Sequence, residues 1–206
     1  MSCEVFGQIV SRETYDKLRD YESLIQKWNP SINLVAKSTL SDIWNRHIVD
    51  SAQVYYAASA ELSGNFTDIG SGGGLPAIVI AILAQGADKQ IQMTMVEADK
   101  RKSVFLRTVI RELDLNNAIV LNERIENMQI PVSKFISARA LAPLTELFGF
   151  AQRLSDDKTT FLFQKGKNWL PEIEIAQNHW FFNYEAIKSE TDSNAVILKI
   201  RGLSRV

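Results

Sequence analysis

Four glycines within five positions form the segment of this sequence best suited to binding a ligand. The segment runs from Phe66 to Pro76 and contains Gly70-Ser71-Gly72-Gly73-Gly74. The residues before the glycines predict a strand, and the apolar run after the proline predicts a helix. Glycines at such a turn let the backbone approach a ligand, and the helix N-terminus offers free N–H groups. We therefore expect Gly70, Gly72 and Gly74 to contact a small molecule, the alternative being a glycine-rich connection without a ligand.

Two acidic residues beside this turn narrow the choice of ligand. Glu97 closes the next predicted strand, where its carboxylate can accept hydrogen bonds from ribose hydroxyls. The spacing Gly72-x-Gly74-x-x-Ala77, with an acid roughly 20 residues on, also satisfies the dinucleotide fingerprint, so a dehydrogenase is a competing interpretation. Asp68, two residues before the first glycine, suits a methionine amino group better than a pyrophosphate. Since the sequence also has no obvious second half for a nicotinamide, we favour S-adenosylmethionine.

Short β-rich runs alternate with helical patterns after residue 62, which predicts a parallel sheet with crossover helices. The predicted strands are 66–69, 91–96, 118–121, 135–137 and 160–164, and the predicted helices are 76–85, 100–113 and 143–154. Two further strands, 180–187 and 196–200, are joined by too short a turn for a parallel crossover and should pair antiparallel. A mostly parallel sheet with a C-terminal antiparallel hairpin is typical of the Rossmann-like, class I α/β fold of S-adenosylmethionine methyltransferases.

Residues 1–62 are predicted to be a helical extension of the Rossmann-like core at 63–206, within a single domain spanning 1–206. One helix should begin after Ser11, a suitable N-cap, and end at Asn29-Pro30, because the residue before proline disfavours the α region. A second helix should carry Leu40 to Tyr55.

Composition excludes several classes of protein. The 206 residues are 46% hydrophobic and 23% charged, as in globular proteins, and contain no apolar run of membrane-spanning length or signal peptide. The single cysteine, Cys3, can form no internal disulfide, so we expect a cytoplasmic protein without membrane association. The net charge is −1, whereas free-standing nucleic-acid binders usually carry a basic excess. A nucleic-acid partner would have to meet a local basic patch.

These segments together resemble the bacterial small-subunit (16S) ribosomal RNA guanine-N7 methyltransferase family, also called the glucose-inhibited division protein B family. The resemblance covers about Lys27 to Lys167. Its marks are Asn33-Leu34, Arg46-His47-Ile48-Val49-Asp50-Ser51, the segment from Asp68 to Pro76, Glu97-Ala98-Asp99-Lys100-Arg101-Lys102, Arg124-Ile125-Glu126 and Ser137-Ala138-Arg139-Ala140. The sequence departs from the family at Val35, where threonine is common, and at Ala77, where glycine is common.

The resemblance implies transfer of a methyl group from S-adenosylmethionine to N7 of one guanine in the decoding-region loop of 16S ribosomal RNA. The substrate would be this RNA within the small ribosomal subunit or an assembly intermediate. The resemblance also implies that Gly70 and Leu75 line the cofactor site, that Ile125 and Glu126 flank the adenine, and that Arg139 contacts the cofactor. Two alternatives remain: a methyltransferase of a small molecule or protein, and a non-catalytic cofactor-binding factor in ribosome assembly.

The missing motifs point to the same kind of target atom. Cytosine C5 methylation needs a cysteine nucleophile, and Cys3 lies far from any predicted strand end. Exocyclic amine methylation usually uses an acidic or amide residue followed by two prolines and an aromatic, where this chain has Ser137-Ala138-Arg139-Ala140. A ring nitrogen such as guanine N7 loses no proton on methylation and needs positioning and electrostatics. We therefore expect no general base and no metal.

Basic residues near the predicted strand and helix ends are candidates for contact with RNA. They are Arg46, His47, Lys100, Arg101, Arg139, Lys165 and Lys167. Ligands bind in open α/β sheets outside the carboxyl ends of strands, which is where Arg139, Lys165 and Lys167 should lie. The alternatives are a solvated turn for the two lysines and a bracing role in the core for Arg46 and His47.

Overall fold

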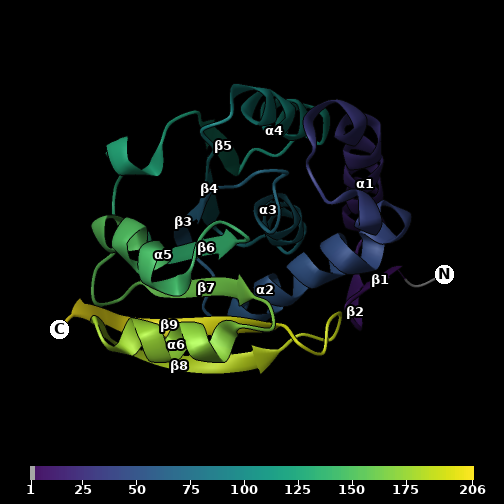
Figure 1. The fold of residues 1–206 in the computed structure, drawn as a ribbon. Helices are drawn as coiled ribbons and strands as arrows, with labels where there is room; N and C mark the ends of the chain where they lie inside the picture. The colour runs from purple at the N-terminus through teal and green to yellow at the C-terminus, as the bar shows by residue number, and fades with distance from the viewer. Residues whose placement is uncertain (1–2) are drawn as a thin grey trace.

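A seven-stranded sheet crosses the part of the chain that the computed structural model describes, residues 3–206 (Figure 1). Its strands are β3 (Gly64–Ile69), β4 (Ile91–Val96), β5 (Ala118–Leu121), β6 (Phe135–Arg139), β7 (Thr160–Lys165), β8 (Trp180–Lys188) and β9 (Val196–Arg205). Their order is β5-β4-β3-β6-β7-β9-β8. The first five are parallel, whereas β9 pairs antiparallel with both β7 and β8. The sheet predicted from the sequence is confirmed.

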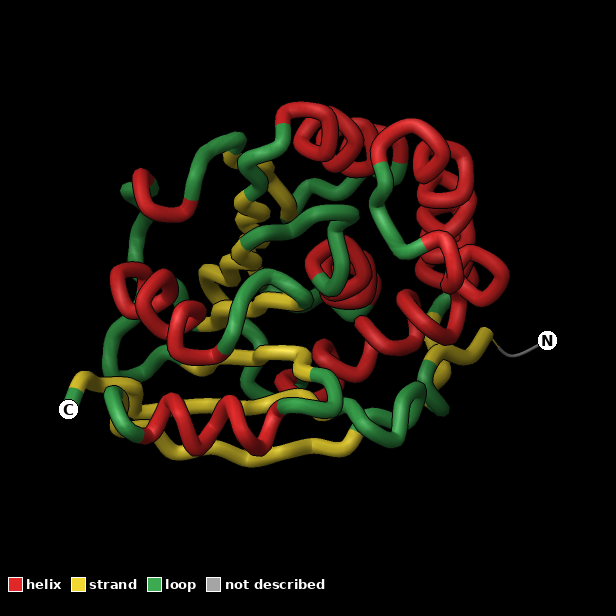
Figure 2. The backbone as a smooth tube through the Cα atoms, viewed as in Figure 1, coloured by secondary structure: helices red, strands yellow, loops and turns green. Residues whose placement is uncertain are grey.

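Helices cover both faces of this sheet (Figures 1 and 2). The longer ones are α1 (Arg12–Ile32), α2 (Asp50–Ala58), α3 (Ala77–Gly86), α4 (Lys100–Glu112), α5 (Leu144–Ala151) and α6 (Trp169–Gln177). Helices α1 to α4 share one hydrophobic cluster, and α5 and α6 share another. Alternation along the strands divides side chains between the two clusters, as with Phe135 and Ile136 on β6. Because both faces are covered, most side chains of the central strands are buried, including the polar Thr67 and Asp68 of β3 and Ser137 of β6.

The N-terminal segment differs in detail from the predicted helical extension. It begins with a hairpin of β1 (Cys3–Val5) and β2 (Gln8–Val10), which the sequence pattern did not indicate. Ser11 caps α1 as predicted, accepting from the Thr14 N–H at 3.1 Å. The prediction that this helix ends at Asn29-Pro30 was wrong, since it continues to Ile32. The Asn29 side chain accepts from two backbone N–H groups just beyond the helix, at 2.7 and 2.8 Å.

The second predicted helix consists of three pieces of different pitch. They are a 3₁₀ helix, η1 (Lys37–Asp42), a π-helix, η2 (Trp44–Val49), and α2. π-helical turns are rare and often lie at functional sites. Two further 3₁₀ turns are η3 (Ile125–Asn127) and η4 (Gln152–Leu154). No helix within residues 3–206 is both long enough and apolar enough to cross a membrane.

Helix α6, which contains Pro171, was not predicted from the sequence. The proline lies in the first turn of the helix, where a missing N–H costs no intrahelical hydrogen bond. The helix packs between α5 and β8, and it carries Glu172 toward the carboxyl end of β7.

Candidate functional site

The glycine turn lies at the carboxyl end of β3, where Gly70, Gly72 and Gly74 all have positive φ (69°, 54° and 87°). A Cβ on Gly74 would collide with Ile78 and Leu106, at 2.5 and 2.9 Å. A Cβ on Gly72 would meet only the Gly70 carbonyl oxygen, at 3.8 Å. Gly72 therefore faces open space. The absence of a side chain at Gly74 lets α3 and α4 pack closely against the turn, and its contact with a ligand stays a prediction.

Helix α1 contacts the glycine turn directly and stabilises it. The buried Tyr21 hydroxyl on α1 donates a hydrogen bond to the Gly73 carbonyl oxygen at 2.5 Å. Burial raises the pKa of Tyr21 well above 10, so the hydroxyl stays protonated and remains a donor. Residues 1–62 thus stabilise the turn directly.

A cavity of about 660 Å³, here called the glycine-loop cavity, opens beside this turn. Residues predicted as cofactor ligands form much of its wall: Gly70, Gly72, Leu75, Glu97, Ile125, Glu126 and Arg139. Leu34 to Ala36, Thr39 and His47 form the opposite side. These last residues precede the core, and among them only His47 was considered a site residue from the sequence. The volume of the glycine-loop cavity is within the range of ligand pockets.

Glu97 is a nearly buried carboxylate on the wall of this cavity. One oxygen accepts from the Gly72 N–H and the other from the Asp99 N–H, both at 2.7 Å. These bonds fix the carboxylate between the glycine turn and the start of α4. Each carboxylate oxygen can accept more than one hydrogen bond, so both remain able to accept from a ligand hydroxyl.

Asp68 is fully buried at the end of β3, and it does not form part of the cavity wall. Its Oδ1 accepts from the Ser137 hydroxyl at 2.5 Å, and its Oδ2 has no hydrogen-bond partner among the described residues. Burial raises the pKa of Asp68 to about 6, partly offset by the bond from Ser137. A buried, ionised carboxylate with a hydrogen bond to only one oxygen is costly, unless a cationic group of a ligand donates to the other oxygen.

Arg139, at the end of β6, is a buried cation that, like the Asp68 carboxylate, has one polar atom without a hydrogen-bond partner among the described residues. Its Nη2 donates to His47 Nδ1 at 2.8 Å and to the Arg46 carbonyl oxygen at 3.2 Å, and lies 3.7 Å from Asp50 Oδ2. Its Nη1 is buried with no hydrogen-bond partner among the described residues. Burial lowers the pKa of Arg139, although arginine stays charged in proteins.

The surroundings of His47 determine its tautomer. Thr39 Oγ1 donates to the Ala36 carbonyl oxygen at 2.8 Å, so it must accept from His47 Nε2, 2.7 Å away. His47 Nδ1 is then the unprotonated nitrogen that accepts from Arg139. Burial and the nearby guanidinium groups lower the pKa of His47 to about 4, which keeps the ring neutral. Both ring nitrogens are therefore engaged within the protein, and the contact of His47 with RNA phosphate stays a prediction.

A second cavity of about 480 Å³ adjoins the first, and Arg46, Arg139, Ala140 and Leu141 line both. Lys165, at the end of β7, lines it and forms an ion pair with Glu172 at 2.7 Å. Lys165 is buried, so the alternative of a solvated turn does not describe it, and its contact with RNA stays a prediction. It also donates to the Ala142 carbonyl oxygen at 2.7 Å.

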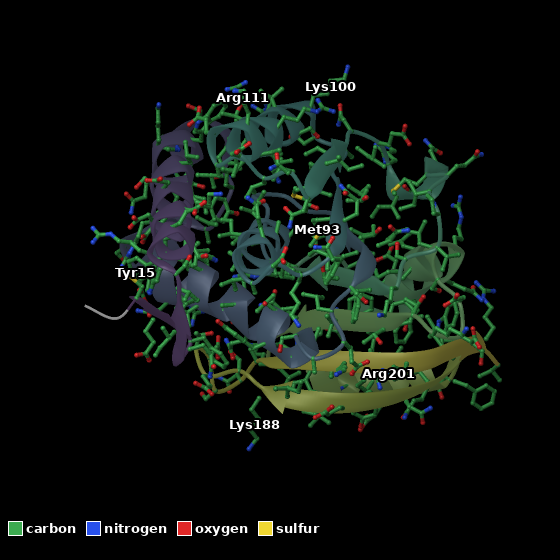
Figure 3. The ribbon with its side chains drawn as sticks, turned by 180° about the vertical axis from the view of Figure 1, so that it is seen from behind. Tyr15, Met93, Lys100, Arg111, Lys188 and Arg201 are labelled. Atoms are coloured by element: carbon green, nitrogen blue, oxygen red, sulfur yellow. The ribbon has the colours of Figure 1, made fainter. Side chains whose placement is uncertain are left out.

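The remaining basic candidates lie outside both cavities. Lys100 and Arg101 are exposed at the start of α4, and Figure 3 shows Lys100 at the outer rim of the molecule. The next residue, Lys102, lines the glycine-loop cavity instead. Asp99 caps this helix, accepting from the Arg101 N–H at 2.7 Å, so basic residues at its start are compensated by a carboxylate. Lys167 is exposed in the turn after β7.

Asp50 is the main site residue that sequence reasoning missed. Its Oδ2 accepts from Gln164 Nε2 on β7 and its Oδ1 from Thr191 Oγ1 in the β8–β9 turn, both at 2.7 Å. It therefore joins α2, β7 and the terminal hairpin at the second cavity. Its position in the Arg46–Ser51 pattern was the available signal, since that pattern is one of the marks of the family resemblance. Among residues 3–206, no cluster of three His, Cys, Asp or Glu side chains could hold a metal.

The order of strands and the glycine turn at the end of β3 define the class I methyltransferase fold. Solved structures agree, at identities that inform on the fold alone. A ribosomal protein L11 methylase from Lactobacillus delbrueckii subsp. bulgaricus has a TM-score of 0.60 and 15% identity, covering 78% of each chain. An O-methyltransferase from Bacillus cereus in complex with SAH has a TM-score of 0.60 and 14% identity, covering 90% of each chain.

Sequence comparison gives the family within this class. A family model described as rRNA small subunit methyltransferase G matches residues 14–197. The protein of that name from Ruegeria pomeroyi is 45% identical over 197 residues, covering 96% of this chain and 95% of the relative. That from Paracoccus denitrificans is 45% identical over 194 residues, covering 94% and 97%. The chain belongs to the rRNA small subunit methyltransferase G family, which confirms the resemblance.

Proposed function

We propose that this protein transfers a methyl group from S-adenosylmethionine to N7 of a guanine in the decoding-region loop of 16S ribosomal RNA. Membership of the family and the printed names of its relatives support small-subunit ribosomal RNA as the substrate. The observation that carries the proposal is the pair of unsatisfied buried atoms of opposite charge, Asp68 Oδ2 and Arg139 Nη1. A methionine moiety carries one ammonium and one carboxylate group, so it complements such a pair.

The residues present fit this cofactor in three parts. Asp68 would hold the ammonium group and Arg139 the carboxylate, each forming the charge-assisted hydrogen bond that its free atom lacks. Glu97 would accept from the ribose hydroxyls, and the open space over Gly72 admits the ligand beside backbone. Ile125 and Glu126 would flank the adenine. When bound, the cofactor supplies an electrophilic methyl group.

The protein's chemical task is then orientation rather than proton transfer. Guanine N7 has an in-plane lone pair and loses no proton when it is methylated, so no general base is needed. His47, the imidazole on the cavity wall, is neutral, and both of its nitrogens are hydrogen-bonded, which suits a structural role. We assign the chain no catalytic base.

We further propose that residues 1–206 act as one cytoplasmic methyltransferase domain on a protein-containing substrate. The segment before the core contributes walls to both cavities, through Arg46 and Asp50 in particular. With a net charge of −1 the chain should bind naked RNA weakly and require the shaped surface of a small subunit or an assembly intermediate. Exposed Lys100, Arg101 and Lys167 would contact phosphates at the rim.

The deciding experiment uses tritiated S-adenosylmethionine and small ribosomal subunits from a strain lacking the endogenous modification. We expect label in one guanine of 16S ribosomal RNA, released as 7-methylguanine on depurination. Binding of the cofactor without labelling of RNA would favour an assembly factor, and labelling of a protein or small molecule would favour another methyltransferase. Tighter binding of NAD than of S-adenosylmethionine would favour a dehydrogenase.

A further inference from the structure

The second cavity lies where a substrate base would have to lie to reach the cofactor. It adjoins the glycine-loop cavity across a shared wall that includes Arg139 and Leu141. The other sides come from the turn after β7, from α6 and from the β8–β9 turn. A volume of about 480 Å³ accommodates one nucleotide extruded from its stack, which is how enzymes reach buried atoms of a base.

The charges of this cavity suit a neutral base better than a phosphate. Each cationic side chain on its wall already has a carboxylate neighbour. The pairs are Lys165 with Glu172 at 2.7 Å, Arg46 with Asp192 at 3.4 Å, and Arg139 with Asp50 at 3.7 Å. A phosphate would have to compete with these carboxylates, whereas an uncharged ring with donors and acceptors on its edge would not.

The Lys165–Glu172 pair leaves hydrogen-bonding capacity facing this space. Glu172 Oε2 accepts from Lys165 and from the Leu144 N–H, at 2.7 and 2.8 Å. In residues 3–206 no hydrogen bond involves Glu172 Oε1, and the side chain remains 25% exposed. Arg139 lines both cavities, and its buried Nη1 is a donor without a partner among the described residues. The cavity therefore offers a carboxylate acceptor at α6 and a guanidinium donor beside the cofactor side.

We propose that the second cavity binds the target guanine and that Glu172 determines its specificity. Glu172 accepts hydrogen bonds from the N1–H and the 2-amino group. Arg139 Nη1 carries two N–H groups, of which one donates to the cofactor carboxylate and the other to O6, on the same edge of the base as N7. Lys165 holds the Glu172 carboxylate in place through the other oxygen. Adenine presents the opposite pattern, an acceptor at N1 and an amino group at position 6, and would meet like groups at both ends. This inference rests on the proposed function, because it assumes an RNA guanine as substrate.

The test compares two substrates and two variants. Small subunits are reconstituted with 16S ribosomal RNA carrying guanosine or inosine at the mapped position, since inosine keeps N7, O6 and N1–H but lacks the 2-amino group. The wild type should methylate inosine with a kcat/KM roughly 10-fold lower, within the discrimination of one base contact. Glu172→Gln should lower kcat/KM for guanosine by about 10- to 100-fold and bring the guanosine-to-inosine ratio toward one.

Matched controls separate recognition from folding. Glu174→Gln changes an exposed carboxylate on the same helix, outside both cavities, and should leave kcat/KM and the ratio unchanged. Calorimetry should give wild-type affinity of Glu172→Gln for S-adenosylmethionine. If Glu172→Gln does not fold, the wild-type comparison of guanosine with inosine decides alone.

Equal rates of the wild type on guanosine and inosine would overturn the assignment, as would an unchanged guanosine-to-inosine ratio in folded Glu172→Gln. Both results leave ribosomal RNA methylation intact, so they refute the assignment of Glu172 without touching the proposed function. A wild type that labels no guanosine-containing subunit would overturn the proposed function, and this inference with it.

Discussion

Asp68 should make cofactor affinity depend on pH in a window where few other groups titrate. Its pKa is raised from 3.8 to about 6 because the carboxylate is fully buried. An ammonium group from the cofactor binds the ionised form, so binding below pH 6 must displace a proton. Affinity should therefore fall roughly tenfold between pH 7 and pH 5, where the cofactor's own α-amino group stays protonated.

The same shift affects stability with the opposite sign. A carboxyl group with a raised pKa in the folded state contributes stability that is present below pH 3.8 and is lost as the pH rises through 6. The gap between 3.8 and about 6, at about 1.4 kcal/mol per pKa unit, amounts to about 3 kcal/mol. About half of this should be lost between pH 5 and pH 7.5. Ionised Asp68 thus lowers the stability of the ligand-free protein at neutral pH, and binding of the cofactor's ammonium group should restore stability.

Asp68→Asn provides the control for both effects. Calorimetric titration of S-adenosylmethionine should show an affinity of the variant about 10- to 100-fold lower at pH 7 and nearly independent of pH. Denaturant unfolding of the ligand-free proteins should show the stability difference moving in favour of Asn as the pH rises from 5 to 7.5. A wild-type affinity that is constant over this range, or a variant that keeps the wild-type slope, would refute the reasoning.

Three further substitutions test the rest of the site. Gly72→Val should abolish most of the cofactor affinity measured by calorimetry, because the new side chain enters the open space of the cavity. The left-handed backbone at this position should also cost the variant about 1–2 kcal/mol of stability. Gly149→Val, a control outside the two cavities, should bind the cofactor normally. Tyr21→Phe leaves the Gly73 carbonyl oxygen unpaired, so the free energy of unfolding should fall by about 1–3 kcal/mol, and an unchanged value would remove the anchoring role. Single-turnover methyl transfer at saturating RNA and cofactor should stay flat between about pH 6 and 9 and persist in His47→Ala, whereas a limb of slope one that His47→Ala abolishes would identify a general base.

Local patterns predicted the sheet well because its strands are buried on both faces. Strand β4 was predicted and is found at Ile91–Val96, where buried apolar residues alternate with Gln92 and Thr94. The strand-turn-helix at the glycines was equally clear, since the turn itself demands glycine. The three-residue strands of the N-terminal hairpin are too short for a period to be detected.

The chemistry of individual residues was harder to predict because it depends on burial and on distant partners. His47 follows an arginine in the sequence and suggested a phosphate contact, but its environment is set by Thr39 and Arg139, and the latter is 92 residues away. Lys165 suggested a solvated turn because its partner Glu172 lies on a helix that the pattern missed. The spacing of residues predicts which helix or strand end a side chain lies on. Its ionisation depends instead on which elements pack against it.

Arg139 shows why the segment before the core belongs to the site. The sheet alone brings this guanidinium to the end of β6, but it does not determine which nitrogen remains free. The π-helix η2 and the start of α2 supply the Arg46 carbonyl, the His47 ring and the Asp50 carboxylate, and all three engage Nη2. Because one nitrogen takes all three contacts, Nη1 is left without a partner among the described residues, in a side chain that lines both cavities. The Arg46–Ser51 pattern therefore has a physical role in the site, since it orients Arg139, a cation that lines both cavities.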